Sequence, residues 1–116
     1  MAHSYKNYKA LVSVLHKHCS AAYPVSVRRV ALGNQIEGKC FKHGRKFVIQ
    51  IAKHLDEARA IDALLHEWAH ARAWNHRLDT APTDEAFNKL SHDAAWGVAY
   101  SEVYSVYEKN FAQSVL

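Results

Sequence analysis

The sequence has 116 residues, of which 49% are hydrophobic and 22% charged, and it carries a formal net charge of +4. These values are typical of a globular protein, and the length allows one domain with one core over residues 1–116. No apolar run approaches the roughly 20 residues of a membrane span, so no membrane partner is expected. Residues 1–9 are polar and lack a signal-peptide core, which predicts a cytoplasmic protein with Cys19 and Cys40 as buried free thiols.

The first half of the chain predicts one amphipathic helix followed by three strands. Apolar residues recur at helical spacing over Ser4–Cys19, and Pro24 lies just beyond, where it disfavours helix. His43-Gly44 is a hairpin signal between the second and third strand-like runs. We therefore expect a small antiparallel sheet with helices on at least one face. The three strand-like runs are Val25–Leu32, Glu37–Lys42 and Arg45–Lys53.

The second half of the chain is mainly helical, which makes the expected fold class α+β. Residues 76–83 carry scattered polar residues and predict a loop. The last helical region has two alternative starts, Asp84 and Ser91, and Ser91 is also a potential break. It ends at about Phe111.

The most specific pattern is an HExxH motif, formed by His66, Glu67 and His70 within a helix that Asp56 would cap and that runs to about Asn75. Residues four apart lie about 40° apart around a helix, so both imidazoles can reach one ion, with Glu67 about 100° round from His66. Zinc accepts neutral imidazole nitrogens, and its catalytic sites keep one position open for water. We interpret the motif as a zinc site with Glu67 beside the attacking water.

A surface helix that carries these residues by chance is the alternative. An apolar stripe on the same helix favours the metal site, because the two histidines stand off that stripe. The stripe consists of Ile61, Leu64, Leu65, Trp68 and Ala69.

A third ligand is needed, because two histidines hold zinc poorly. His92 lies on the same helical stripe as Trp96, so an orientation toward the core also turns it toward the motif helix. Glu102 lies about 80° away on the opposite flank, loosely like the glutamate ligand of thermolysin-like enzymes. His76 would require the chain to double back sharply. The residues favour His92 and leave Glu102 and His76 as alternatives.

The order of a helix, three strands, the HExxH helix and His92-Asp93-Ala94-Ala95-Trp96 resembles the SprT-like zinc metallopeptidase domains, over most of the chain to about Tyr107. Members of that family include DNA-associated proteases and small stand-alone proteins of phages and bacteria. The resemblance implies a zincin-like fold, a Zn²⁺ cofactor, a protein or peptide substrate and Glu67 as catalytic base. The chain departs from the family at Asp93, where glycine is common, and has no Cys-rich zinc ribbon. The metal ligands that the resemblance implies are His66, His70 and His92.

Other residues suggest supporting roles. Tyr100 and Tyr104 are potential oxyanion donors by position, with core packing as the alternative. Asp93 suits the first turn of a helix and could instead orient an imidazole. An extended substrate would pair with an edge strand. We expect three tryptophans to pack in the core, namely Trp68, Trp74 and Trp96.

Basic residues gather in the strand region, where Glu37 is the one acidic residue between Arg28 and Lys53. This asymmetry predicts either contact with nucleic acid or an acidic partner, or a solvated sheet edge. Besides a zinc endopeptidase, the sequence therefore leaves open a zincin-scaffold binding module for DNA or protein, and a hydrolase of another bond. The residues of the expected DNA contact are Arg28, Arg29, Lys39, Lys42, Arg45 and Lys46.

Overall fold

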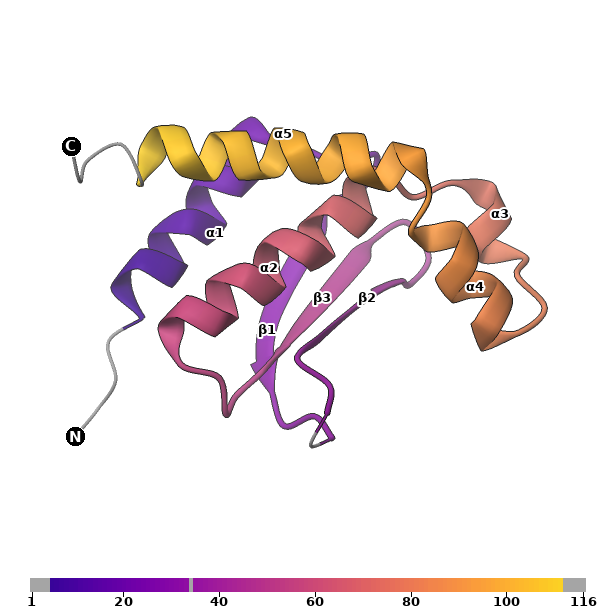
Figure 1. Ribbon diagram of the computed structural model, residues 1–116, viewed down its shortest axis with the longest axis horizontal. Helices are drawn as coiled ribbons and strands as arrows, with labels where there is room; N and C mark the ends of the chain where they lie inside the picture. Colours follow the sequence, from indigo (N-terminus) through magenta and orange to yellow (C-terminus); the bar gives the residue numbers. More distant parts are fainter. Residues whose placement is uncertain (1–4, 34, 112–116) are drawn as a thin grey trace.

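Three strands form a mixed sheet in the order β1-β3-β2 (Figure 1). The computed structural model describes residues 5–33 and 35–111, so Ser4 and Asn34 of the expected helix start and turn lie outside the described residues. The central strand pairs in parallel with β1 and antiparallel with β2. The strands are β1 (Val25–Val30), β2 (Gly38–Lys42) and β3 (Phe47–Ala52).

The expectation of an antiparallel sheet was therefore wrong for β1, whereas the α+β class is confirmed. The hairpin between β2 and β3 forms as predicted, with Gly44 at φ 64°, a conformation that favours glycine. The strand β3 is the most apolar, with Ile49 and Ile51 fully buried, and it takes the centre of the sheet. Because β3 separates β1 from β2, the two strands that follow each other in the sequence are not neighbours in the sheet.

Three long helices build the core together with the sheet, namely α1 (Lys6–His18), α2 (Glu57–Arg72) and α5 (Ala94–Asn110). The helix α2 contacts β2 and β3 on one side and α1 and α5 on its other sides (Figure 1). Trp68 is fully buried as expected, and its Nε1 donates to the carbonyl of Cys19 at 2.7 Å. No helix in the described part of the chain is long and apolar enough to cross a membrane. Fully buried residues include Leu11, Leu15, Ile49, Ile51, Leu64, Leu65, Trp68 and Val103.

Two short helices, α3 (His76–Asp79) and α4 (Asp84–Ser91), connect α2 to α5. The expected loop over residues 76–83 thus contains a helix, which Asn75 caps by accepting from the N–H of Arg77 at 2.9 Å. The potential break near Ser91 is confirmed. Asp93 caps α5 by accepting from the N–H of Trp96 at 3.0 Å, which assigns it a helix-terminal role.

The start of α2 also fixes the start of α1. Asp56 caps α2 as predicted and accepts from the N–H of Arg59 at 2.9 Å. Glu57 reaches across to α1 and accepts from the N–H groups of Asn7 at 3.0 Å and Tyr8 at 3.2 Å. These two N–H groups have no partner within their own helix, so Glu57 supplies the cap that α1 lacks.

Arg29 joins β1 to the segment that leads into α2. Its Nη2 donates to the carbonyls of Ala52, Lys53 and Leu55 at 3.0 to 3.1 Å. The guanidinium also lies 4.5 Å from the centre of the Tyr5 ring, as in a cation–π contact. Arg29 therefore has a structural role, and the nucleic-acid contact expected of it stays a prediction.

Candidate metal centre

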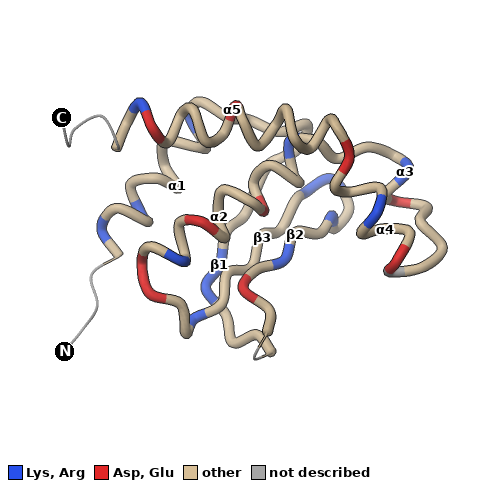
Figure 2. Tube along the Cα trace, in the orientation of Figure 1, with Lys and Arg blue, Asp and Glu red and all other residues tan. Residues whose placement is uncertain are grey.

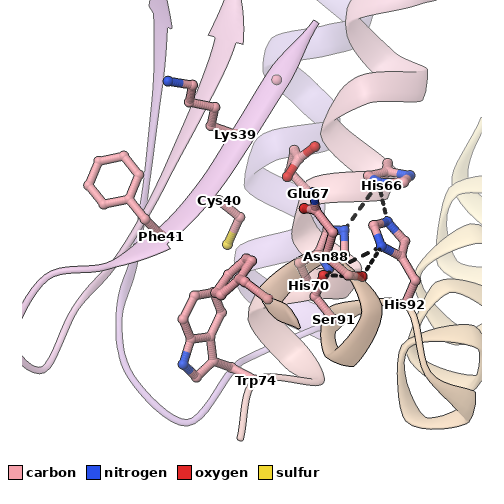
Figure 3. Close-up of a pocket in the computed structure, with 12 residues that line it drawn as sticks. Lys39, Cys40, Phe41, His66, Glu67, His70, Trp74, Asn88, Ser91 and His92 are labelled. Carbon is pink, nitrogen blue, oxygen red and sulfur yellow. Dashed lines mark hydrogen bonds between the residues drawn. The ribbon is translucent and has the colours of Figure 1, made fainter. Parts of the chain in front are cut away.

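Three histidines from two regions of the chain converge at one point (Figure 3). His66 and His70 lie one turn apart on α2, and His92 lies between α4 and α5. The Nε2 atom of His66 lies 3.1 Å from that of His70 and 3.5 Å from that of His92. One ligand atom from each of the three residues lies within 4.8 Å of the others. The structure thus brings together the three residues that the sequence favoured.

This spacing fits a metal ion. Two imidazole nitrogens at a tetrahedral angle around zinc, each about 2.05 Å from the ion, are separated by about 3.3 Å. The two measured separations, 3.1 and 3.5 Å, lie on either side of that value. The described part of the chain supplies three His/Cys/Asp/Glu ligands to this group, so a fourth position is left for water or substrate.

Backbone carbonyls orient two of the rings. The Nδ1 of His92 lies 2.9 Å from the carbonyl of Asn88, and His70 forms a hydrogen bond to the backbone of Ser91. A carbonyl can only accept, so the Nδ1 of His92 carries the proton and its Nε2 keeps a lone pair for a metal. The last carbonyls of a helix lack helical partners, so the end of α4 is a natural acceptor for such rings.

Burial favours the neutral form of two of the imidazoles, those of His66 and His70. His70 is 8% exposed, and burial, followed by the neighbouring His66 and His92, lowers its pKa to about 3. Burial, and then His92, also lowers the pKa of His66. Neutral imidazole is the form that binds metals, so both residues are in their ligand form at neutral pH.

Glu67 lies beside the histidines in a cavity of about 510 Å³. Burial raises the pKa of its carboxyl to about 7, a value suited to a general base at neutral pH. A Cβ on Gly38 would lie 3.0 Å from the Cγ of Glu67 and 3.3 Å from the carbonyl of Gln50. Glycine at this position therefore allows the edge strand β2 to approach Glu67 closely.

The remaining site predictions do not lie in the three-histidine group. Glu102 lies 3.4 Å from Arg72, with which it forms an ion pair, and His76 begins α3 outside the three-histidine group. The Tyr100 ring packs against the Trp96 ring at an interplanar angle of 31°, and Tyr104 stacks on Tyr100. Neither tyrosine lines the cavity, so their role as oxyanion donors remains a prediction.

Several residues of the site were not predicted as part of it. Asn88 and Ser91 act through backbone groups, which leave no trace in side-chain patterns. Trp96, expected in the core, is half-buried, and its ring centre lies 5.0 Å from that of His66 and 5.2 Å from that of His92. The sequence suggested a helical stripe shared by His92 and Trp96, but α5 begins only at Ala94, so His92 lies outside the helix that carries Trp96.

Basic side chains follow the strands, as Figure 2 shows, but they have different surroundings. Lys42 forms an ion pair with Asp79 at 2.8 Å, whereas Arg45 and Lys46 are exposed at the hairpin. The strand register places the exposed Arg28 and Lys39 on either side of Gln50, in one row across the sheet.

Comparison with known proteins adds no assignment. No family model matches the chain, and no curated protein and no solved structure is detectably similar to it. The functional argument therefore depends on the geometry of the site.

Proposed function

We propose that the protein is a zinc-dependent endopeptidase of the SprT-like type. The observation that carries the proposal is the convergence of three imidazole Nε2 atoms beside Glu67 in an open cavity. Three neutral ligands and a free fourth position are the donor set of catalytic zinc. Imidazole sites also accept other divalent ions, so zinc is the metal to be tested first.

Each residue of the site would have a defined task. The three histidines would hold the ion, which supplies Lewis-acid chemistry by lowering the pKa of water toward ~7 and polarising the substrate carbonyl. Glu67 would accept the proton of the attacking water and pass it to the leaving amine. Burial alone shifts the pKa of this carboxyl, with no contribution from a hydrogen bond or a neighbouring charge, so the carboxylate is available for this transfer.

The strand β2 would hold the substrate. It forms one edge of the sheet, so its outer backbone groups have no neighbouring strand among the described residues, and four of its residues line the cavity. An extended peptide that pairs with this edge would pass Glu67 at Gly38, where the strand comes closest.

Zinc content and peptide cleavage test the proposal together. We expect about one zinc per chain in protein purified without added metal, loss of zinc in His92→Ala, and retention in the matched control Glu102→Ala. Glu67→Gln should keep the zinc and lose at least about 100-fold in cleavage rate. Full activity in Glu67→Gln would disprove the base assignment, and zinc loss in Glu102→Ala alone would move the third ligand to Glu102.

The row of Arg28 and Lys39 favours a second candidate function, a nucleic-acid contact on the sheet. Neither side chain belongs to an ion pair in the described part of the chain, and both are exposed. Gel mobility of short DNA at low and high salt tests this, because phosphate-driven binding weakens as salt rises. Arg28→Ala with Lys39→Ala should abolish the shift. An unchanged shift would exclude this surface.

A further inference from the structure

The cavity extends beyond the groups that would perform the chemistry. Away from the three histidines its lining includes Cys40 from β2, Trp74 from the segment just after α2 and Phe87 from α4. In Figure 3, Cys40 and Trp74 lie close together on the side of Glu67 that faces β2. Lys39 and Phe41 point to the other side of the strand, away from Glu67 (Figure 3). An apolar wall thus adjoins the catalytic glutamate.

Contacts on both sides hold this wall in place. The Trp74 ring lies between Phe47 and Phe87, with ring centres 5.6 and 5.5 Å away. Its Nε1 donates to Asp79 at 3.0 Å, and the other carboxylate oxygen of Asp79 pairs with Lys42 at 2.8 Å. Because the indole N–H is engaged outside the cavity, the ring presents carbon to the cavity.

The wall offers no partner to a charged group. Burial, and then the neighbouring Glu67, raises the pKa of the Cys40 thiol, which therefore stays neutral. A charged side chain placed between Cys40, Trp74 and Phe87 would lose water, and none of these three residues would form an ion pair with it. An apolar side chain would instead gain free energy in proportion to the area that it buries.

We propose that the wall formed by Cys40, Trp74 and Phe87 is a specificity subsite, which selects peptides with a large apolar side chain next to the scissile bond. This inference rests on the proposed function, because it takes the histidines and Glu67 as the point of cleavage. Phe87 is the residue that sets the size of the subsite. It is partly exposed on a short helix, so it can be replaced without opening the main core.

Short amino-acid hydroxamates test the subsite without requiring turnover, because the hydroxamate binds the metal and places one side chain beside it. Their affinities for the zinc-loaded protein would be measured by calorimetry with benzyl, isobutyl, methyl, carboxymethyl and aminobutyl side chains. We expect the benzyl and isobutyl compounds to bind about 10- to 100-fold more tightly than the methyl compound. The two charged compounds should bind no better than the methyl compound.

Variants of Phe87 test whether the preference for large apolar side chains depends on the wall. Phe87→Trp should fill the subsite and weaken benzyl binding at least about tenfold, with little change for methyl. Phe87→Ala should weaken benzyl binding by a similar factor through lost contact. Val98→Ala is the matched control, because Val98 is an exposed apolar side chain of α5 that does not line the cavity. Zinc content and thermal unfolding would show that each variant is folded and loaded.

The outcomes separate the subsite from the peptidase proposal. Equal affinities for all side chains, or a preference that persists in both Phe87 variants, would overturn the subsite. A Phe87-dependent preference without cleavage of any peptide would retain the subsite and remove the peptidase function. Cleavage at equal rates whatever the neighbouring side chain would retain the peptidase function and remove the subsite. A protein that binds no metal overturns both.

Discussion

The two ends of α2 carry similar numbers of polar residues, but these residues have different partners. At the start of the helix, Asp56 and Glu57 accept from backbone N–H groups, and Arg59 pairs with Glu37 at 2.7 Å. Toward its end, His66 and His70 face each other and His92, and Glu67 faces the cavity. The first set forms hydrogen bonds and ion pairs with other groups of the protein, whereas the second set faces the cavity.

The difference indicates which residues are placed to hold a metal ion. A buried polar group without a protein partner costs free energy, so a cluster of such groups is informative. The Nε2 of His92 is a lone-pair acceptor, because the Nδ1 of that ring donates to the carbonyl of Asn88, and the Nε2 atoms of His70 and His92 both approach that of His66. A cation at that point would bind the three nitrogens at once. The polar side chains at the start of α2 need no such ion, because they bond to other groups of the protein.

The largest effect is expected from removing the most buried ligand. His70→Ala should weaken zinc binding by at least about 100-fold, because each protein ligand contributes several kcal/mol to a site of this kind. Competition with a chromophoric chelator measures the change. Arg59→Ala, at the other end of the same helix, is the control and should leave zinc affinity unaltered. Unchanged zinc affinity in His70→Ala would place the metal elsewhere.

Stability should respond in the opposite way at the start of α2. Arg29→Met removes the guanidinium that donates to three carbonyls and should lower the free energy of unfolding by about 2–3 kcal/mol. Zinc affinity should not change. Urea denaturation of the metal-free protein measures the loss, with the exposed neighbour Arg28→Met as a control expected within about 0.5 kcal/mol of wild type. A similar loss in both variants would argue against the carbonyl contacts.

The cap of α5 should affect both properties, because it adjoins the third ligand. Asp93→Ala should cost about 1 kcal/mol of stability and weaken zinc binding about tenfold by loosening His92. Asp56→Ala removes the equivalent cap of α2, ten residues before His66, and should cost similar stability with no change in zinc affinity. Equal zinc affinities in the two variants would show that the cap does not position His92.

The sequence predicted the ligands better than it predicted their setting. Helical spacing placed His66, Glu67 and His70 on one helix, because side-chain periodicity reports which face is buried. His92 joins them as predicted, but not from a helical stripe shared with Trp96, because α5 begins only at Ala94. The same periodicity does not report which strands are neighbours, so the parallel pairing of β1 with β3 was missed. The acceptors at Asn88 and Ser91 are backbone groups. Every residue has them, so nothing in the sequence indicated that these two would bond to the histidines.

Two buried side-chain atoms packed near the start of α2 have no hydrogen-bond partner among the described residues, namely the hydroxyl of Tyr8 on α1 and the Nε of Arg29 on β1. Tyr8 is 5% exposed, and its hydroxyl has no hydrogen-bond partner in the described part of the chain, although its backbone N–H is bonded to Glu57. Tyr8→Phe removes the unpaired hydroxyl and keeps the ring beneath Arg29. We therefore expect stability to stay level or rise by up to about 1 kcal/mol in chemical denaturation at pH 7.

The pH dependence of stability in wild type and in Tyr8→Phe gives a second, independent test of how the Tyr8 hydroxyl is buried. Burial raises the pKa of Tyr8 to about 12 from an ordinary value of 10, so the native state keeps the phenol proton longer than the unfolded chain does. The stability that this neutral phenol contributes is present in full below pH 10 and is lost between pH 10 and 12. Wild type should lose stability more steeply than Tyr8→Phe over that interval. If instead Tyr8→Phe is less stable than wild type at pH 7, the hydroxyl has a hydrogen-bond partner in the folded protein.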